Sequence, residues 1–193
     1  DRAVARARAL GVPAVALSFE PLPREFFAAG ARPPRLMLPR AKVEGLWALG
    51  CDGVGLLRFD ARLAAMPAAE FARTVLAAQL GAREVWVGPD FRFGRGGVGD
   101  PVLLQRLGEE YGFDVDVVGD VQGGGRRVSS SWVRDLLAAG DVEGAARLLG
   151  RAHTVTGEVV HGLKRGRELG FPTANLSADA EGFIPADGIY AGW

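Results

Sequence analysis

The sequence predicts an α/β protein, in which a doubly wound parallel sheet is followed by the start of a β-rich region. Two observations lead to this prediction. Short apolar strands alternate with amphipathic helices as far as residue 149, and from His153 onward the pattern becomes that of β-structure. We therefore expect two domains, residues 1–149 and residues 150–193, with Gly150-Arg151-Ala152 as the linker.

The first region reads as a regular alternation of elements. Residues 1–10 form a helix that Gly11 ends, and residues 12–19 (VPAVALSF) are a continuous apolar run, typical of a central parallel strand buried on both faces. Pro67 is suited to the first turn of a helix. The remaining expected helices are 42–49, 67–80 and 101–111, and the remaining expected strands are 53–59, 84–87 and 113–118. Glycine-rich loops are expected at 88–99 and 123–127.

A helix start that follows the second loop has the features of an anion site. Ser130 or Ser131 is a good N-cap for a helix that ends at Gly140, and free backbone amides and the macrodipole favour negative charge there. Arg134, one turn in, directs its side chain back toward this start. An ATP triphosphate would fit. The alternative is an ordinary serine-capped surface helix. Asp141 caps the helix that follows.

The β-rich region contains a basic glycine loop between expected strands at 154–161, 183–185 and 188–193. Its glycines let the backbone approach an anion, and its cations supply counter-charge. Pro172 favours extended backbone, so Thr173 and Asn175 share one face and offer oxygen ligands to a nucleotide-bound Mg²⁺. The alternative is an exposed basic hairpin. The glycines and cations are Gly162, Lys164, Arg165, Gly166, Arg167 and Gly170.

Composition limits the classes of partner. The 193 residues carry 23 Lys and Arg against 23 Asp and Glu, which argues against a general nucleic-acid or membrane-surface role. Cys51 is the single cysteine, so no intrachain disulfide forms and a reducing cytoplasm is the expected location. We expect a fragment, because residues 1–10 read as the middle or end of a helix and Trp193 lies inside an apparent strand. The sequence does not indicate an oligomeric state.

Four segments resemble, in order, the motifs of bacterial bifunctional riboflavin kinase/FMN adenylyltransferases. They are residues 19–23 (FEPLP), 88–94 (GPDFRFG), 128–134 (VSSSWVR) and 162–175 (GLKRGRELGFPTAN). The resemblance implies a Rossmann-like nucleotidylyltransferase domain followed by a Greek-key β-barrel, truncated here. It also implies an enzyme that uses ATP and Mg²⁺ to convert riboflavin to FMN and FMN to FAD. Because only about forty barrel residues are present, we expect them to be poorly ordered alone or to lean on the first domain.

The resemblance also implies residue roles. ATP in the adenylyltransferase would contact Ser129, Ser130, Ser131 and Arg134, and flavin would contact Asp90, Phe91 and Phe93. ATP in the kinase would contact Gly162, Lys164, Gly166, Gly170, Pro172, Thr173 and Asn175, the last two also binding Mg²⁺.

The chain departs from the family pattern at several points. Leu22 replaces a His, Ser131 replaces a Thr, and Pro89 occupies a variable slot. The family's His-x-Gly-His and its kinase Glu are expected before residue 1 and after residue 193, so no catalytic residue is assigned. Two other functions stay open: a non-catalytic flavin or nucleotide sensor, and a nucleotidyltransferase for another substrate.

Overall fold

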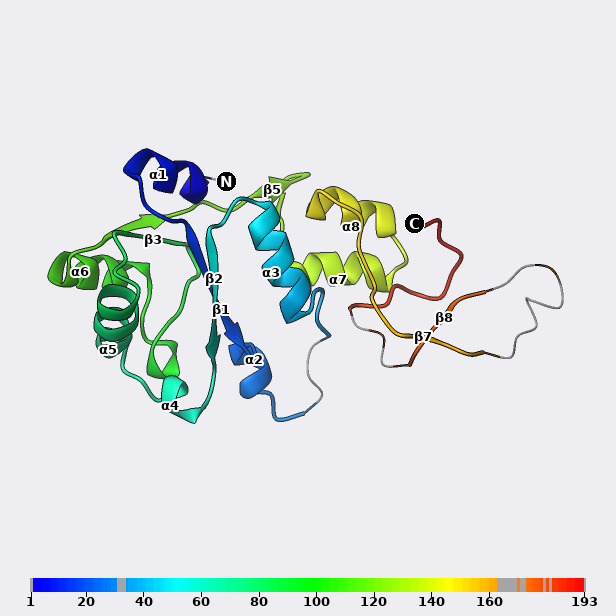
Figure 1. The fold of residues 1–193 in the computed structure, drawn as a ribbon, viewed down its shortest axis with the longest axis horizontal. Coiled ribbons are helices and arrows are strands. Elements are labelled where there is room, and N and C mark those ends of the chain that lie inside the picture. The colour runs from blue at the N-terminus through cyan, green and yellow to red at the C-terminus, as the bar shows by residue number, and fades with distance from the viewer. Residues whose placement is uncertain are drawn as a thin grey trace. The chain divides into compact units, whose positions relative to one another are not determined.

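The computed structural model describes residues 2–30, 34–162, 170, 173–178, 180 and 182–192. It is a mixed α/β structure (Figure 1). Its helices are α1 (Arg2–Leu10), α2 (Pro23–Phe26), α3 (Pro39–Ala48), α4 (Ala61–Ala64), α5 (Ala68–Phe71), the π-helix η1 (Ala72–Gln79), the 3₁₀ turn η2 (Arg95–Gly97), α6 (Pro101–Tyr111), α7 (Ser130–Ala138) and α8 (Val142–Leu149). Its strands are β1 (Val15–Glu20), β2 (Gly53–Arg58), β3 (Glu84–Val87), β4 (Asp114–Val117), β5 (Gln122–Gly123), β6 (Arg126–Arg127), β7 (Val159–Val160) and β8 (Asn175–Leu176).

Contacts divide the chain into two compact units. Unit 1 contains residues 1–32 and 43–121, and unit 2 contains residues 33–42 and 122–193. This division differs from the domains expected at 1–149 and 150–193, because α7 and α8 fall in the same unit as the β-rich region. The expected domain boundary itself stays a prediction.

Unit 1 contains two parallel strand pairs, as the alternation of strands and helices predicts. β1 pairs with β2 from Val15 opposite Gly53 to Glu20 opposite Arg58, and β3 pairs with β4 in parallel register (Figure 1). Within the described residues β1 has β2 as its ladder partner. The prediction that this strand is buried on both faces is wrong: Val15 is 50% exposed and the other β1 residues are only half-buried.

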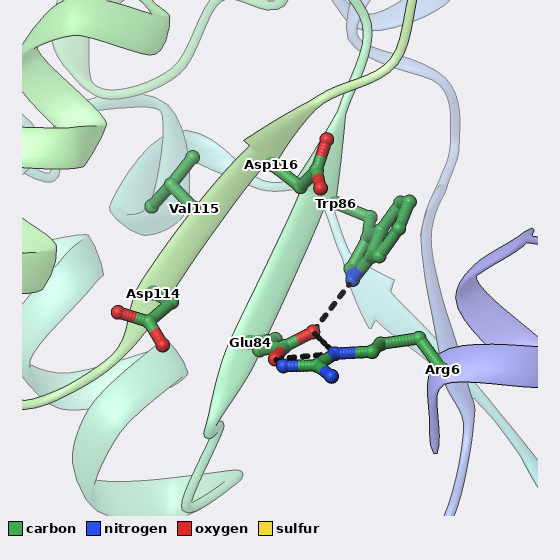
Figure 2. A pocket seen from close by; sticks show the side chains of 6 residues that line it. All are labelled: Arg6, Glu84, Trp86, Asp114, Val115 and Asp116. Carbon is green, nitrogen blue, oxygen red and sulfur yellow. Dashed lines mark hydrogen bonds and ion pairs between the residues drawn. The ribbon is translucent and has the colours of Figure 1, made fainter. Parts of the chain in front are cut away.

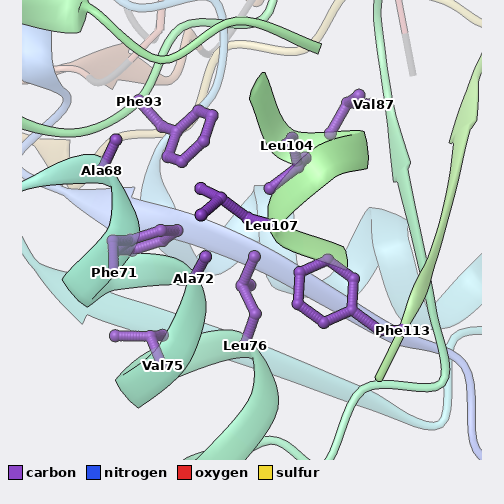
Figure 3. Packing of buried hydrophobic residues seen from close by; sticks show 10 residues of the cluster. All are labelled: Ala68, Phe71, Ala72, Val75, Leu76, Val87, Phe93, Leu104, Leu107 and Phe113. Carbon is purple, nitrogen blue, oxygen red and sulfur yellow. The ribbon is translucent and has the colours of Figure 1, made fainter. Parts of the chain in front are cut away.

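The core of unit 1 lies between its helices and strands (Figure 3). The helix expected over 67–80 forms, but Pro67 is its N-cap residue rather than part of its first turn, and its second part is π-helical. Its buried face meets α6, where Leu104 is fully buried. The cluster consists of Ala68, Phe71, Ala72, Val75, Leu76, Val87, Phe93, Leu104, Leu107 and Phe113.

The longer segment of unit 2, residues 122–193, begins with a hairpin where the sequence predicted only a loop. β5 and β6 pair antiparallel around Gly124 and Gly125, whose φ values are 55° and 78°. Two successive residues with positive φ are what a tight hairpin turn of matching twist requires, and glycine adopts that backbone without strain. The hairpin leads directly into α7.

The β-rich region forms less sheet than expected. Of the expected strand 154–161, only the two residues of β7 form a strand, and β7 pairs antiparallel with β8. The prediction of a strand over 188–193 is wrong for residues 188–192, because no ladder partner lies beside them among the described residues. Tyr190 instead donates its hydroxyl hydrogen to the Ala186 carbonyl at 2.6 Å.

The core of unit 2 joins α7 and α8 to the β-rich region. Val133, Leu137 and Ala145 are buried, and Phe183 packs against them. The backbone N–H of Ala186 donates to the Leu137 carbonyl at 3.0 Å. The region after residue 150 therefore leans on helices that precede it, as its small size predicts.

Candidate functional site

The start of α7 is capped by Ser129. Its backbone is extended (φ −143°, ψ 154°), and its hydroxyl oxygen accepts a hydrogen bond from the Trp132 N–H at 3.2 Å. The prediction of Ser130 or Ser131 as N-cap is therefore wrong by one or two residues. Both lie inside the first turn, exposed, where the backbone N–H groups of a helix lack intrahelical acceptors. The helix start keeps the donors that an anion site needs.

Basic side chains surround this helix start. Arg126 and Arg127 lie exposed on β6, just before the cap, and the Arg126 guanidinium sits 4.8 Å from the centre of the Trp132 ring. Arg134 Nε donates to the Pro34 carbonyl at 2.8 Å, within unit 2. The structure thus gives Arg134 a protein partner, and its contact with a triphosphate stays a prediction.

The loop after β3 places its three flavin-contact candidates differently. Asp90 is exposed and Phe91 is half-buried, whereas Phe93 is 6% exposed and belongs to the unit 1 core (Figure 3). The Phe91 and Phe93 rings stack 5.5 Å apart at 15°. Phe93 is held further by two backbone hydrogen bonds with Gly99. The burial of Phe93 gives it an anchoring role in the loop, and the flavin contacts of Asp90 and Phe91 stay predictions.

A cluster of four phenylalanines lies where β1 and β2 end, and sequence reasoning missed it. Phe26 contacts Phe27 and Phe59 with ring centres 5.1 and 5.4 Å apart, and Phe19 contacts Phe59 at 5.7 Å. Phe27 is 64% exposed. Ligands in parallel sheets bind beyond the carboxyl ends of strands, so exposed aromatic surface here is suited to a flat ring. The adjacent phenylalanines soon after the first strand were the available signal.

The turn between β1 and α2 explains what Leu22 does. A cis peptide bond joins Glu20 to Pro21, and Leu22 is the N-cap residue of α2. Its N–H donates to Glu25 Oε2 at 2.9 Å, and Glu25 is 5% exposed. The turn is therefore held by a hydrogen bond between the Leu22 backbone and Glu25, which does not use the Leu22 side chain.

The basic glycine loop is described only in part. Lys164, Gly166 and Pro172 lie outside the described residues, as do Arg165 and Arg167. Gly170 has φ 83°, a left-handed backbone that favours glycine. Thr173 and Asn175 are both exposed, and Asn175 begins β8. Their contact with a metal stays a prediction.

A cavity of about 310 Å³ lies at α1, β3 and β4 of unit 1, and none of its lining residues is a predicted site residue (Figure 2). Arg6 donates to Glu84 at 2.7 Å, and the Trp86 indole N–H donates to the same carboxylate at 3.3 Å. The hydrogen bond from Arg6 is the main cause that lowers the pKa of Glu84. Asp114 and Asp116 line the same cavity. We interpret this cluster as the anchor of α1 on the sheet.

The described residues also bear on metal binding and on membrane insertion. In the parts of the chain that the structure describes, no group of three or more His, Cys, Asp or Glu side chains could hold a metal ion. No helix among those parts is long and apolar enough to cross a membrane. A metal held by Thr173 and Asn175 would need the rest of its ligands from a nucleotide and water.

Comparison with known proteins identifies the family. A family model described as FAD synthetase matches residues 1–132, and one described as riboflavin kinase matches residues 149–193. The chain belongs to the bifunctional riboflavin kinase/FMN adenylyltransferase family. The prediction from the four ordered motifs is thereby confirmed.

Members of the bifunctional riboflavin kinase/FMN adenylyltransferase family match along nearly the whole chain. That of Pseudomonas fluorescens is 45% identical over 96% of this chain and 59% of its own length. That of Escherichia coli K12 is 42% identical over 95% and 58%. A crystal structure from Streptococcus pneumoniae, described as a macrolide-efflux protein, has a TM-score of 0.84 and 29% identity over 95% of this chain and 60% of that one. The chain thus spans about three fifths of the length of these relatives.

Proposed function

We propose that the full-length protein makes FAD from riboflavin in two ATP-dependent steps. In the first, the γ-phosphoryl group of ATP passes to the ribityl 5′-hydroxyl of riboflavin and gives FMN and ADP. In the second, an FMN phosphate oxygen attacks the α-phosphorus of another ATP, and pyrophosphate leaves. The observation that carries the proposal is the presence of both family matches, in order, on one chain.

The second step would use the start of α7. The N–H groups of Ser130 and Ser131 offer donors to the departing pyrophosphate, and Arg134 supplies positive charge one turn in. Ser129 shapes this start through its cap on Trp132. Catalysis at such a site consists mostly of holding the two phosphates in line and stabilising the charge that develops on the leaving group.

The flavin would lie against the carboxyl ends of the unit 1 strands. We assign contacts to Asp90 and Phe91, with Phe93 anchoring the loop from below. The exposed rings of Phe26 and Phe27 extend the aromatic surface. An isoalloxazine ring gains from stacking on such surfaces in offset or edge-to-face geometry.

The first step would use the basic glycine loop and β8. Gly162, Lys164, Gly166, Gly170 and Pro172 are assigned to ATP.

A Mg²⁺ bound with the ATP would supply positive charge that offsets the charge of the phosphates. The donor set fits it, because a hydroxyl and an amide are neutral hard oxygen donors and both side chains are exposed. Thr173 and Asn175 would hold and orient it.

The finer architecture belongs to the same proposal. The parallel pairs with helical crossovers support a Rossmann-like, doubly wound nucleotidylyltransferase domain over 1–149. The antiparallel pair β7–β8 supports the start of a Greek-key barrel over 150–193. The partners would be small molecules in the cytoplasm, with no nucleic acid and no membrane.

The test is to supply the full-length protein with riboflavin, ATP and Mg²⁺ and to separate FMN and FAD by chromatography. We expect both products. An Asn175→Ala variant should form FMN more slowly and need more Mg²⁺ to do so, while still converting added FMN to FAD at the normal rate. An Arg134→Ala variant should slow FAD formation and leave FMN formation unchanged. Absence of either product from the unaltered protein would refute the proposal. Flavin binding without turnover would instead identify a sensor, and transfer of AMP to a non-flavin acceptor would identify a different nucleotidyltransferase.

A further inference from the structure

Gly162 lies against the side chain of Asn175. A Cβ placed on Gly162 would overlap the carboxamide nitrogen of Asn175, and would lie 2.9 Å from its Cγ and 3.3 Å from its Oδ1. Non-bonded heavy atoms settle at about 3.5–4.0 Å. Any residue larger than glycine at position 162 must therefore push the Asn175 carboxamide away.

The backbone conformation at position 162 does not require glycine. Gly170 has a positive φ of 83°, and Gly162 is not among the positive-φ glycines of the described chain. An alanine at position 162 could adopt the same backbone conformation, but its Cβ would collide with the Asn175 side chain. The two glycines are thus needed for different reasons, Gly170 for conformation and Gly162 for the room it leaves.

The strand register shows where the carboxamide goes. Val160 on β7 lies opposite Asn175 on β8 in an antiparallel pair. Gly162 lies two residues beyond Val160, toward the end of the pair at which Thr173 precedes Asn175. Because the Asn175 side chain reaches Gly162, it leans toward the Thr173 end. The carboxamide as a whole thus lies toward the Thr173 end of the pair, with its nitrogen nearer to Gly162 than its oxygen.

We propose that Gly162 is a positioning residue, which leaves space for the Asn175 carboxamide to lie beside Thr173 and so places the two metal-binding oxygens together. The inference rests on the kinase function proposed above, and it changes the role of Gly162. The resemblance implied a contact with ATP, whereas here Gly162 acts through Asn175.

The first test observes the carboxamide itself. In the full-length protein with a non-hydrolysable ATP analogue, Mn²⁺ should broaden the side-chain NH₂ resonances of Asn175, which Asn175→Ala identifies by removing them. In Gly162→Ala we expect these resonances to shift and to need about tenfold more Mn²⁺ for equal broadening, the scale of loss seen when residues that orient metal ligands are changed. Gly192→Ala is the matched control, because nothing lies within 4 Å of its Cβ position.

The second test is a double-mutant cycle on the Mg²⁺ concentration that gives half-maximal FMN formation. Gly162→Ala should raise this Mg²⁺ concentration about tenfold when Asn175 is present, and should leave it unchanged in the Asn175→Ala background. An equal rise in both backgrounds, or resonances in Gly162→Ala that match those of the unaltered protein, would overturn the inference alone. Unchanged Mg²⁺ dependence in Asn175→Ala would overturn the proposed metal role and the inference with it.

Discussion

The cap of α7 allows a quantitative test, because three adjacent serines differ in their contacts. The hydroxyl of Ser129 accepts from the Trp132 N–H, while Ser130 and Ser131 lie exposed in the first turn. Replacing a serine N-cap by alanine costs about 0.5–2 kcal/mol. The distance of 3.2 Å is at the long end of the N–H···O range, so we expect about 1 kcal/mol for Ser129→Ala. That corresponds to roughly a fivefold change in the opening equilibrium of the helix start.

Native-state amide hydrogen exchange measures this opening directly. In Ser129→Ala the amides of Trp132 and Val133 should exchange about fivefold faster. The Trp132 N–H loses its acceptor, the Ser129 hydroxyl, and the Val133 N–H donates to the carbonyl of the same residue 129, at the loosened helix start. In Ser131→Ala the change should stay within about 0.5 kcal/mol, because an exposed helix position gains propensity from alanine. If Ser131→Ala accelerated exchange and Ser129→Ala did not, the assignment of Ser129 as the cap would be refuted.

Three further predictions follow from burial and charge. The hydrogen bond from the Arg6 guanidinium lowers the pKa of Glu84, so this carboxylate stabilises the fold above its unfolded pKa of about 4.3 and ceases to do so as pH falls through the lower folded pKa. In thermal melts between pH 6 and 3, Glu84→Gln should therefore lose less melting temperature on acidification than the unaltered protein. An equal loss in both proteins would contradict this. Phe93→Ala should lower the free energy of unfolding, measured in urea, by about 3–5 kcal/mol, because this side chain is buried. Phe91→Ala should mainly weaken FMN binding, measured by fluorescence titration. Phe183→Ala should cost about 2 kcal/mol and speed exchange in α7 and α8, while Ile184→Ala, 61% exposed, should leave both unchanged.

The elements predicted best are those whose ends carry local signals. The strand Glu84–Val87 and the helix Pro101–Tyr111 have the bounds that the sequence predicts. The helix follows Asp100, which caps it through Leu103, and ends before Gly112 in a left-handed conformation. Capping carboxylate, first-turn proline and terminal glycine act within a few residues, so they can be read without the fold.

The features predicted worst depend on contacts between distant segments. The sequence offers Ser130 or Ser131 as the cap, whereas the structure uses Ser129, whose extended backbone follows the β5–β6 hairpin. The phenylalanine cluster joins Phe19 and Phe59, forty residues apart in sequence, and no local pattern links them. The contact of Arg134 with the Pro34 carbonyl spans 100 residues. A sequence motif therefore indicates where a site lies, but it does not show which of the side-chain atoms already form hydrogen bonds within the protein.

Helix α7 begins inside one family match and packs against residues of the other. The FAD synthetase match ends at residue 132, one turn into α7, and the riboflavin kinase match begins at residue 149. Between these limits the buried face of α7, Val133 and Leu137, is covered in part by Phe183 from the kinase match. Removing residues 150–193 would expose that face and remove the N–H donor to Leu137, whose carbonyl lies near the end of α7. The packing of α7, at whose start the proposed pyrophosphate site lies, thus depends on residues of the riboflavin kinase match.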